Sequence, residues 1–212
     1  MDDVITILKN AGAVLTDDHF VYTSGKHGSV YVNKDALYPH TRESSRVGRM
    51  FAEKYKDLTI DTVVAPALGG IILSQWTAYH LSALKDAEIF GIYTEKDAEK
   101  NQVFTRGYDR FVKGKNVLVI EDLTTTGGSV LKVVNSVRGA GGNVVAVGVM
   151  VNRNPDSVNE TMMGAPFHAL GVLKAEAFEE KDCPLCAKGV AINTTVGHGK
   201  KYLEAKASAG TI

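Results

Sequence analysis

Two adjacent acids followed by hydroxyl residues and glycines form the strongest chemical pattern in the sequence. Glu121 and Asp122 come directly after the apolar run 117–120, and residues 124–129 read Thr-Thr-Thr-Gly-Gly-Ser. Paired carboxylates at the end of a strand can hydrogen-bond the hydroxyls of a sugar or approach a metal–phosphate complex, and glycine-rich helix starts bind phosphate through backbone N–H groups. The pattern predicts a site for a phosphorylated sugar, and an ordinary capped turn is the alternative. The expected phosphate contacts are Thr125, Thr126, Gly127, Gly128 and Ser129.

The elements that must position these residues alternate between strand and helix from residue 60 onward. Runs of β-branched apolar residues between helices are typical of strands that are covered on both faces, which indicates a parallel sheet in an α/β fold. Ligands bind such sheets at the carboxyl ends of the strands, so the loops that follow strands should carry the chemistry. The expected strands are 62–65, 89–94, 117–120, 144–151 and 167–173, and the expected helices are 41–55, about 70–83 and about 129–138.

The N-terminal part has a different pattern. Residues 3–11 have helical apolar spacing, and residues 20–23 and 30–33 read as two strands. The polar stretch 24–29 between them predicts a tight turn, so we expect a hairpin.

Composition limits the class of protein. The chain of 212 residues has 24 basic and 24 acidic residues, and this balance argues against nucleic-acid binding and against a membrane-surface module. Its apolar runs are too short to span a bilayer, and no secretory signal is visible at the N-terminus. Two cysteines in a chain of this length indicate a reducing compartment. We expect a cytoplasmic protein with one domain, 1–212.

The acid pair and the loop after it resemble the hallmark of the type I phosphoribosyltransferases. The resemblance implies that Glu121 and Asp122 contact the ribose hydroxyls of phosphoribosyl pyrophosphate, and that residues 125–129 hold its 5′-phosphate. It also implies an α/β fold with a central, mainly parallel sheet flanked by helices. A small hood, mainly from residues 1–40 and the C-terminal segment, and a C-terminal tail would complete that fold.

Other segments resemble the orotate-specific branch of this family. Residues 22–35 are similar to a hairpin that helps to cover the base, and 65–71 are similar to the pyrophosphate loop. Residues 93–108 match the position of a mobile catalytic loop, although a plain surface loop would have the same polar pattern. Segments 150–154 and 181–189 are similar to a base-contacting stretch and to a tail. The implied roles are catalysis for Lys96 with the acid pair, pyrophosphate binding for Ala67, Leu68, Gly69, Lys100 and Arg106, and base binding for Lys26 and Arg153.

Three positions depart from the family pattern. Thr23 stands where many members have lysine, Gly69 stands where some have lysine, and the stretch 95–101 keeps only Lys96 and Lys100 as basic residues. The expected reaction is transfer of phosphoribosyl to orotate, which yields orotidine 5′-monophosphate and pyrophosphate. Two alternatives stay open: a phosphoribosyltransferase for another base, or a regulator that senses phosphoribosyl pyrophosphate without catalysis.

Metals and partners follow from the same resemblance. The family implies Mg²⁺ held by substrate oxygens, so no metal site built from protein ligands is expected, and it implies a homodimer. The pair Cys183 and Cys186 has zinc binding and redox chemistry as alternatives, but only His198 lies nearby in sequence, and a structural tail is expected. The histidines His19, His27, His40 and His168 have no partner at metal-ligand spacing in the sequence.

Overall fold

The computed structural model describes residues 3–22, 24–174 and 176–209, and it groups them into two compact units. The first unit contains the chain up to Ile7 together with Leu37–Lys174. The second contains Leu8–Ala36 and the C-terminal segment that follows Lys174. The organisation of residues 1–212 as one domain stays a prediction.

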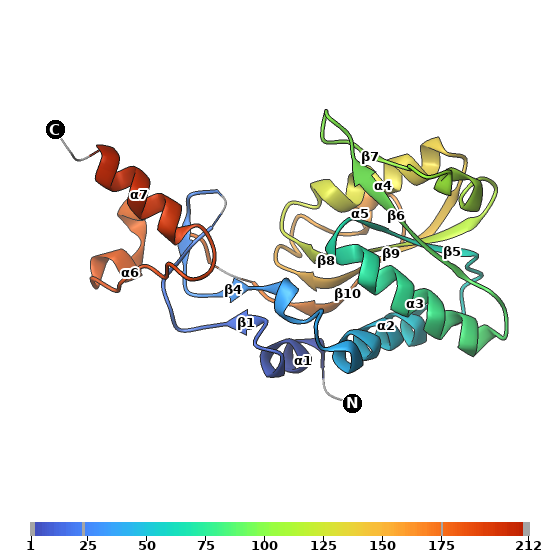
Figure 1. The fold of residues 1–212 in the computed structure, drawn as a ribbon, viewed down its shortest axis with the longest axis horizontal. Coiled ribbons are helices and arrows are strands. Elements are labelled where there is room, and N and C mark those ends of the chain that lie inside the picture. Colours follow the sequence, from blue (N-terminus) through green and yellow to red (C-terminus); the bar gives the residue numbers. More distant parts are fainter. Residues whose placement is uncertain (1–2, 23, 175, 210–212) are drawn as a thin grey trace. The chain divides into compact units, whose positions relative to one another are not determined.

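The first unit is built around a six-stranded sheet in the order β10-β9-β8-β5-β6-β7 (Figure 1). Its neighbouring strands run parallel, except that β7 is antiparallel to β6. The five strands expected from the sequence are all present, and β7 is an addition. The bounds are β5 Thr62–Pro66, β6 Phe90–Lys96, β7 Gln102–Val103, β8 Asn116–Thr124, β9 Asn143–Asn152 and β10 Phe167–Val172.

Helices cover both faces of this sheet, which confirms the expected α/β fold (Figure 1). Helix α2 lies close against β9 because Gly148 has no side chain: a Cβ there would meet the Tyr55 hydroxyl at 2.9 Å and Phe51 at 3.0 Å. The Tyr55 hydroxyl donates to the Val147 carbonyl at 3.1 Å. The helices of this unit are α1 Val4–Asn10, which continues into the second unit, α2 Thr41–Tyr55, α3 Gly69–Lys85, α4 Gly128–Gly139 and α5 Glu160–Met163, with a 3₁₀ turn at Tyr108–Phe111.

Valines dominate the core between α4 and the sheet. Val130, Val133, Val134 and Val137 recur at the spacing of one helix face, and all are fully buried. They pack in one cluster with strand residues that include Val64, Val117, Val119 and Val147. This apolar layer fixes the start of α4 relative to the end of β8, where the predicted phosphate loop lies.

The second unit contains two short antiparallel pairs, and these differ from the expected hairpin. β2 (Phe20–Val21) pairs with β3 (His27–Gly28), and β1 (Val14–Leu15) pairs with β4 (Tyr31–Val32). The prediction that residues 20–23 pair with 30–33 is therefore wrong. The chain reverses earlier because Gly25 adopts φ 81°, and the Tyr22 N–H bonds the Lys26 carbonyl at 2.8 Å. Thr23 lies outside the described residues.

Short helical segments complete the second unit. They are 3₁₀ turns at Lys34–Ala36 and Glu180–Asp182, α6 Pro184–Ala187 and α7 Gly199–Ala209. Across the part of the chain that the structure describes, no helix is long and apolar enough to cross a membrane.

Candidate active site

The parallel strands bring three predicted site segments to one edge of the sheet. β5, β8 and β9 are neighbours, and Thr124 at the end of β8 aligns with Asn152 at the end of β9. The chain leaves these strands into residues 67–68, 125–127 and 153–159, respectively. The sequence-predicted pyrophosphate loop, phosphate loop and Arg153 therefore share the carboxyl edge, where α/β sheets bind ligands.

The acid pair lies within β8 rather than after it. β8 continues to Thr124, so Glu121 and Asp122 are strand residues, and their side chains are only 5% and 4% exposed. The Asp122 carboxylate accepts the backbone N–H of Leu123 at 2.6 Å and the hydroxyl of Tyr38 at 2.8 Å. Tyr38 is a contact that sequence analysis missed, since it lies far from Asp122 in the chain. These two donors hold the Asp122 carboxylate in one orientation.

Burial raises the pKa of Glu121 well above its ordinary value, and the neighbouring Asp122 charge adds to this shift. Hydrogen bonds from the Asp122 N–H and from Ser129 oppose the shift. Desolvation dominates, so burial shifts the carboxyl of Glu121 towards its protonated form. A buried carboxyl with a strongly shifted pKa, close to a phosphate-type loop, is a common feature of functional sites.

The predicted phosphate loop has the geometry of an anion cradle. Gly127 adopts φ 73°, which favours glycine, and its N–H donates to the Thr124 hydroxyl at 3.0 Å. α4 begins at the next residue, so its first-turn N–H groups and its positive dipole end face the loop. The exposed loop residues are Thr125, Thr126 and Ser129.

The predicted pyrophosphate loop is a two-residue connection between β5 and α3. Only Ala67 and Leu68 lie between Pro66 and Gly69, where α3 starts. The Ala67 N–H donates to the Thr94 carbonyl at 2.8 Å, and the Ala67–Leu68 peptide bond is cis. Leu68 is 81% exposed.

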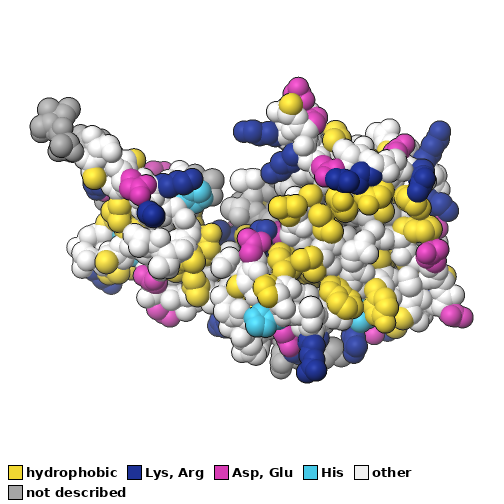
Figure 2. All heavy atoms as spheres, in the orientation of Figure 1, with side chains coloured by type: hydrophobic (Ala, Val, Ile, Leu, Met, Phe, Trp, Pro, Cys, Tyr) yellow, Lys and Arg dark blue, Asp and Glu magenta, His cyan; other side chains and the backbone are white. Residues whose placement is uncertain are grey.

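The predicted mobile loop contains a hairpin. β6 continues to Lys96 and turns back into β7, and Lys96 pairs with Gln102. The Lys132 ammonium donates to the Lys100 carbonyl at 2.6 Å, and this hydrogen bond connects the turn of the hairpin to α4. Lys96 and Lys100 are exposed, and Figure 2 shows basic and acidic side chains together at the protruding end of the hairpin. The sequence showed only polarity here, because a strand of two residues has no readable period.

Arg106 follows the hairpin and is partly committed to a neighbour. Its guanidinium lies 3.3 Å from the Glu95 carboxylate. The pKa of Glu95 is lowered, mainly by a hydrogen bond from Thr105 and secondly by the contact with Arg106. Arg106 is exposed, and its role at the pyrophosphate stays a prediction.

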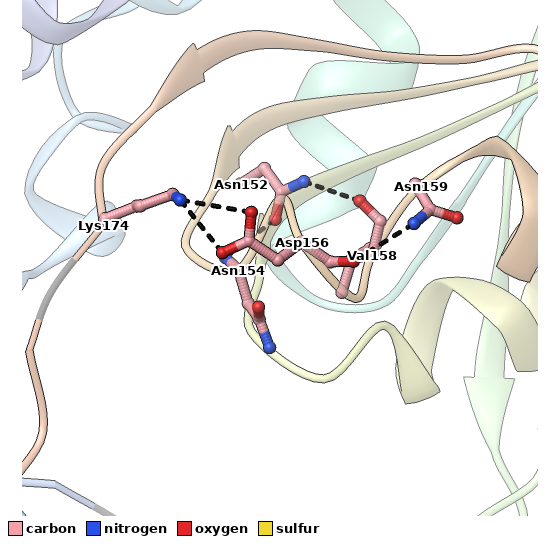
Figure 3. A network of polar contacts seen from close by, with 6 residues as sticks. All are labelled: Asn152, Asn154, Asp156, Val158, Asn159 and Lys174. Atoms are coloured by element: carbon pink, nitrogen blue, oxygen red, sulfur yellow. Dashed lines mark hydrogen bonds and ion pairs between the residues drawn. The ribbon is translucent and has the colours of Figure 1, made fainter.

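Arg153 lies in the loop that follows β9, and Figure 3 shows the polar contacts of its neighbours Asn152 and Asn154. The backbone N–H of Arg153 donates to the carbonyl of Thr124, the last residue of β8, at 2.8 Å. Buried Asn152 donates to the Val158 carbonyl at 2.9 Å and accepts the Asn154 N–H at 3.0 Å. These bonds hold both ends of the loop that carries Arg153, and the network has no signature in the sequence.

Lys26 lies in the second unit, where it forms an exposed ion pair with Glu179 at 3.2 Å. The structure brings together the acid pair, the phosphate loop, the pyrophosphate loop and Arg153 within the first unit. The role of Lys26 at the base stays a prediction.

Comparison with known proteins agrees with this geometry. Residues 33–162 match the model of the phosphoribosyl transferase domain. An orotate phosphoribosyltransferase from Thermotoga maritima is 36% identical over 196 residues, which are 92% of this chain and 98% of the relative. One from Caldanaerobacter subterraneus is 34% identical over 177 residues, which are 84% of this chain and 87% of the relative.

The chain belongs to the orotate phosphoribosyltransferase family. Solved structures agree on the fold. The orotate phosphoribosyltransferase of Mycobacterium tuberculosis H37Rv superposes with a TM-score of 0.64 at 24% identity, covering 81% of this chain and 97% of that one. The orotate phosphoribosyltransferase fold therefore accounts for the sheet and the loops at its carboxyl edge.

Proposed function

We propose that this protein transfers the phosphoribosyl group of phosphoribosyl pyrophosphate to orotate, which forms orotidine 5′-monophosphate and releases pyrophosphate. The proposal rests mainly on one observation at the carboxyl edge of the sheet. The buried acids Glu121 and Asp122 of β8 lie close in the chain to the start of α4, where Gly127 forms the turn. A mycobacterial orotate phosphoribosyltransferase of the same fold has been solved with phosphoribosyl pyrophosphate bound. The pattern of charge and donors here suits the same substrate class.

The phosphate loop supplies the binding energy for the 5′-phosphate. The first-turn N–H groups of α4 and the hydroxyls of Thr125, Thr126 and Ser129 are donors, and the helix dipole favours the phosphate charge. This anchor holds the ribose over the end of β8. Anchoring at a remote group allows binding energy to be used for orientation at the reacting carbon.

Glu121 and Asp122 suit the ribose hydroxyls. Carboxylates accept hydrogen bonds from hydroxyls, and these bonds strengthen when the sugar ring gains positive charge in an oxocarbenium-like transition state. The positive charge that develops on the sugar ring beside Glu121 would favour the ionised form of this carboxyl. The Tyr38 hydroxyl keeps Asp122 oriented for this task. Catalysis would come from positioning and charge stabilisation, without a protein nucleophile.

We propose that Mg²⁺ accompanies the substrate. Two carboxylates, those of Glu121 and Asp122, cannot by themselves supply the six ligands of an octahedral ion. Among the described residues, neither acid belongs to a group of three or more potential metal-ligand side chains. That donor set fits an ion bound largely by pyrophosphate, ribose hydroxyls and water, which would neutralise the leaving group.

The cations of the hairpin suit the pyrophosphate. Lys96 and Lys100 are exposed on a hairpin tethered to α4, and Arg106 lies at its base. Together with the backbone of residues 67–69, they could neutralise the leaving group and exclude water. Movement of this hairpin is part of the proposal.

Arg153 suits the carboxylate that distinguishes orotate from uracil. A guanidinium can form two parallel hydrogen bonds with a carboxylate, and the fixed loop reduces the ordering cost. Lys26 is the second proposed base contact. We also propose a cytoplasmic homodimer, for which the exposed Tyr79 and Leu84 of α3 offer apolar surface.

The experiment that tests the reaction is pyrophosphate release by purified protein with phosphoribosyl pyrophosphate and Mg²⁺, with and without orotate. We expect release that depends on orotate. Tight binding of phosphoribosyl pyrophosphate in calorimetry, with no pyrophosphate release on addition of any base, would instead favour the regulator.

A further inference from the structure

Four potential metal ligands converge in the second unit. His19, His27, Cys183 and Cys186 each offer one ligand atom, and all four atoms lie within 4.8 Å of one another. His19 is 1% exposed, His27 is fully buried and Cys183 is 2% exposed. Sequence spacing hid this cluster, because the histidines precede the cysteines by more than 150 positions.

The distances between these atoms match the edges of a tetrahedron around zinc. With ordinary Zn–N and Zn–S bond lengths, tetrahedral ligand atoms are about 3.3–3.8 Å apart. Here His19 Nε2 lies 3.7 Å from each sulfur, His27 Nδ1 lies 3.2 Å from the Cys186 sulfur, and the two nitrogens are 2.9 Å apart. The two shortest separations must lengthen by a few tenths of an ångström for the ion to fit between the four ligand atoms.

The surroundings orient the His19 ring as a ligand and hold the backbones of both histidines. His19 Nδ1 lies 2.8 Å from the Val190 carbonyl, an arrangement in which Nδ1–H donates and the Nε2 lone pair faces the cluster. The backbones are also fixed: the Asn193 N–H bonds the His19 carbonyl at 2.7 Å, and His27 exchanges two backbone bonds with Phe178. An outer hydrogen bond of this kind is typical of metal-bound histidine.

The second unit has little else to hold its C-terminal segment. Within described residues 176–209, Cys183 is the only buried hydrophobic residue, and it belongs to the cluster. Small units with weak cores commonly depend on a metal or on disulfides, and both cysteines are free thiols here. A bound dication with two thiolates would also be electrically neutral, which suits a buried position.

We propose that His19, His27, Cys183 and Cys186 form a structural Zn²⁺ site that joins the β2–β3 hairpin to the C-terminal segment. The S₂N₂ donor set and tetrahedral spacing favour zinc, and four protein ligands leave no open position for catalysis. The site is separate from the proposed transfer reaction, and it holds whether or not the chain turns over orotate.

The test is metal content and ligand spectroscopy on the full chain. Protein expressed with zinc in the medium should contain one zinc per chain, and Co²⁺ replacement should give the intense visible bands of tetrahedral thiolate coordination. Cys183→Ser and His27→Asn should each lose the metal. His40→Asn, at an exposed histidine of the first unit, is the matched control and should retain it.

A rescue variant separates ligation from folding. His27→Cys replaces one zinc ligand by another, and Nδ1 is the ring nitrogen nearer the backbone, so a thiolate can take its place. We expect His27→Cys to bind zinc with a Co²⁺ spectrum shifted towards three-thiolate coordination. Folded wild-type protein that stays metal-free with added Zn²⁺, or that carries a Cys183–Cys186 disulfide instead, would overturn the proposal.

Discussion

The two units bury polar side chains in different places, and the difference separates chemistry from architecture. In the first unit, Glu121 and Asp122 are buried at the end of a strand, and neither belongs to the valine cluster that forms the core. In the second, His19 and His27 are buried where the two parts of the unit meet. Buried polar groups at a sheet edge can serve a ligand, whereas those at the centre of a small unit must be satisfied by one another or by a metal.

Removal of the metal should give the largest of the predicted effects. It should destabilise the second unit and leave the first unit unchanged. If zinc joins the second unit, a strong chelator should sharply increase hydrogen exchange in residues 8–36 and 176–209, because the folding of small metal sites is coupled to binding. Exchange in the strands of the first unit should stay slow. Mass-spectrometric hydrogen exchange measures both, and equal protection with and without chelator would break the comparison.

Asp122→Asn should lower kcat/KM by roughly 10²- to 10³-fold, about 2–4 kcal/mol of transition-state stabilisation. The fold should be kept, since the amide oxygen can accept the Leu123 N–H, the amide NH₂ can donate to the Tyr38 hydroxyl, and the valine core is untouched. Steady-state kinetics with thermal unfolding measures both effects. Asp86→Asn, at an exposed left-handed position that asparagine tolerates, is the matched control with wild-type kinetics. Unchanged kinetics in Asp122→Asn would remove the acid pair from the site.

Arg153→Ala should lower kcat/KM for orotate by roughly 10- to 100-fold, because a charge-assisted pair contributes about 1.5–3 kcal/mol. The Kd of phosphoribosyl pyrophosphate should change little. Arg153→Lys should recover only part of the loss, since an ammonium lacks the planar fork. Kinetics with orotate as the varied substrate measures this, with the exposed Arg42→Ala as control. Intact orotate turnover in Arg153→Ala would assign the carboxylate to another group.

Gly127→Ala should weaken the phosphate loop by about 1–3 kcal/mol, because φ 73° strains a residue with a Cβ. That Cβ would also meet the Met162 sulfur at 2.7 Å. We expect a higher KM for phosphoribosyl pyrophosphate and a lower Tm. Gly139→Ala, where no atom lies within 4 Å of the new Cβ, should keep both values. If both variants behave alike, the strained turn is not what shapes the loop.

The smallest of the predicted effects is that of Glu121→Gln on the free energy of unfolding. This substitution should change how that free energy depends on pH. The pKa of Glu121 is raised in the folded state, so the folded protein holds a proton that the unfolded chain releases above its ordinary pKa of about 4.3. Stability from this group is therefore present at low pH and is lost as pH rises towards the folded pKa. The variant should gain stability relative to wild type as pH rises, measured by urea unfolding from pH 5 to 8. A parallel pair of curves would contradict the raised pKa.

The first unit was largely predictable from sequence, because its signals are local. Helix 41–55 and the five apolar strands were expected, since β-branched runs and helical spacing can be read within a few residues. The end of β8 was misplaced, because Glu121 and Asp122 are polar and their burial depends on neighbouring elements. Tyr38 and the Asn152 network were missed for the same reason: each acts through contacts that have no sequence period.

The second unit was less predictable because its contacts are long-range. The hairpin register was wrong, since a glycine turn within the predicted polar loop reversed the chain early. His19 and His27 had no partner by spacing, yet the fold places them against Cys183 and Cys186. Where strands have two residues, local patterns carry little information on pairing.

The central claim is that the carboxyl edge of the first unit transfers phosphoribosyl to orotate. One competition reaction tests it most directly: purified protein, Mg²⁺ and limiting phosphoribosyl pyrophosphate, with orotate, uracil, adenine and hypoxanthine at equal concentration. Mass spectrometry then identifies the nucleotides formed. The account predicts orotidine 5′-monophosphate as the dominant product. A different nucleotide as the main product, or no nucleotide at all from folded protein, would contradict it.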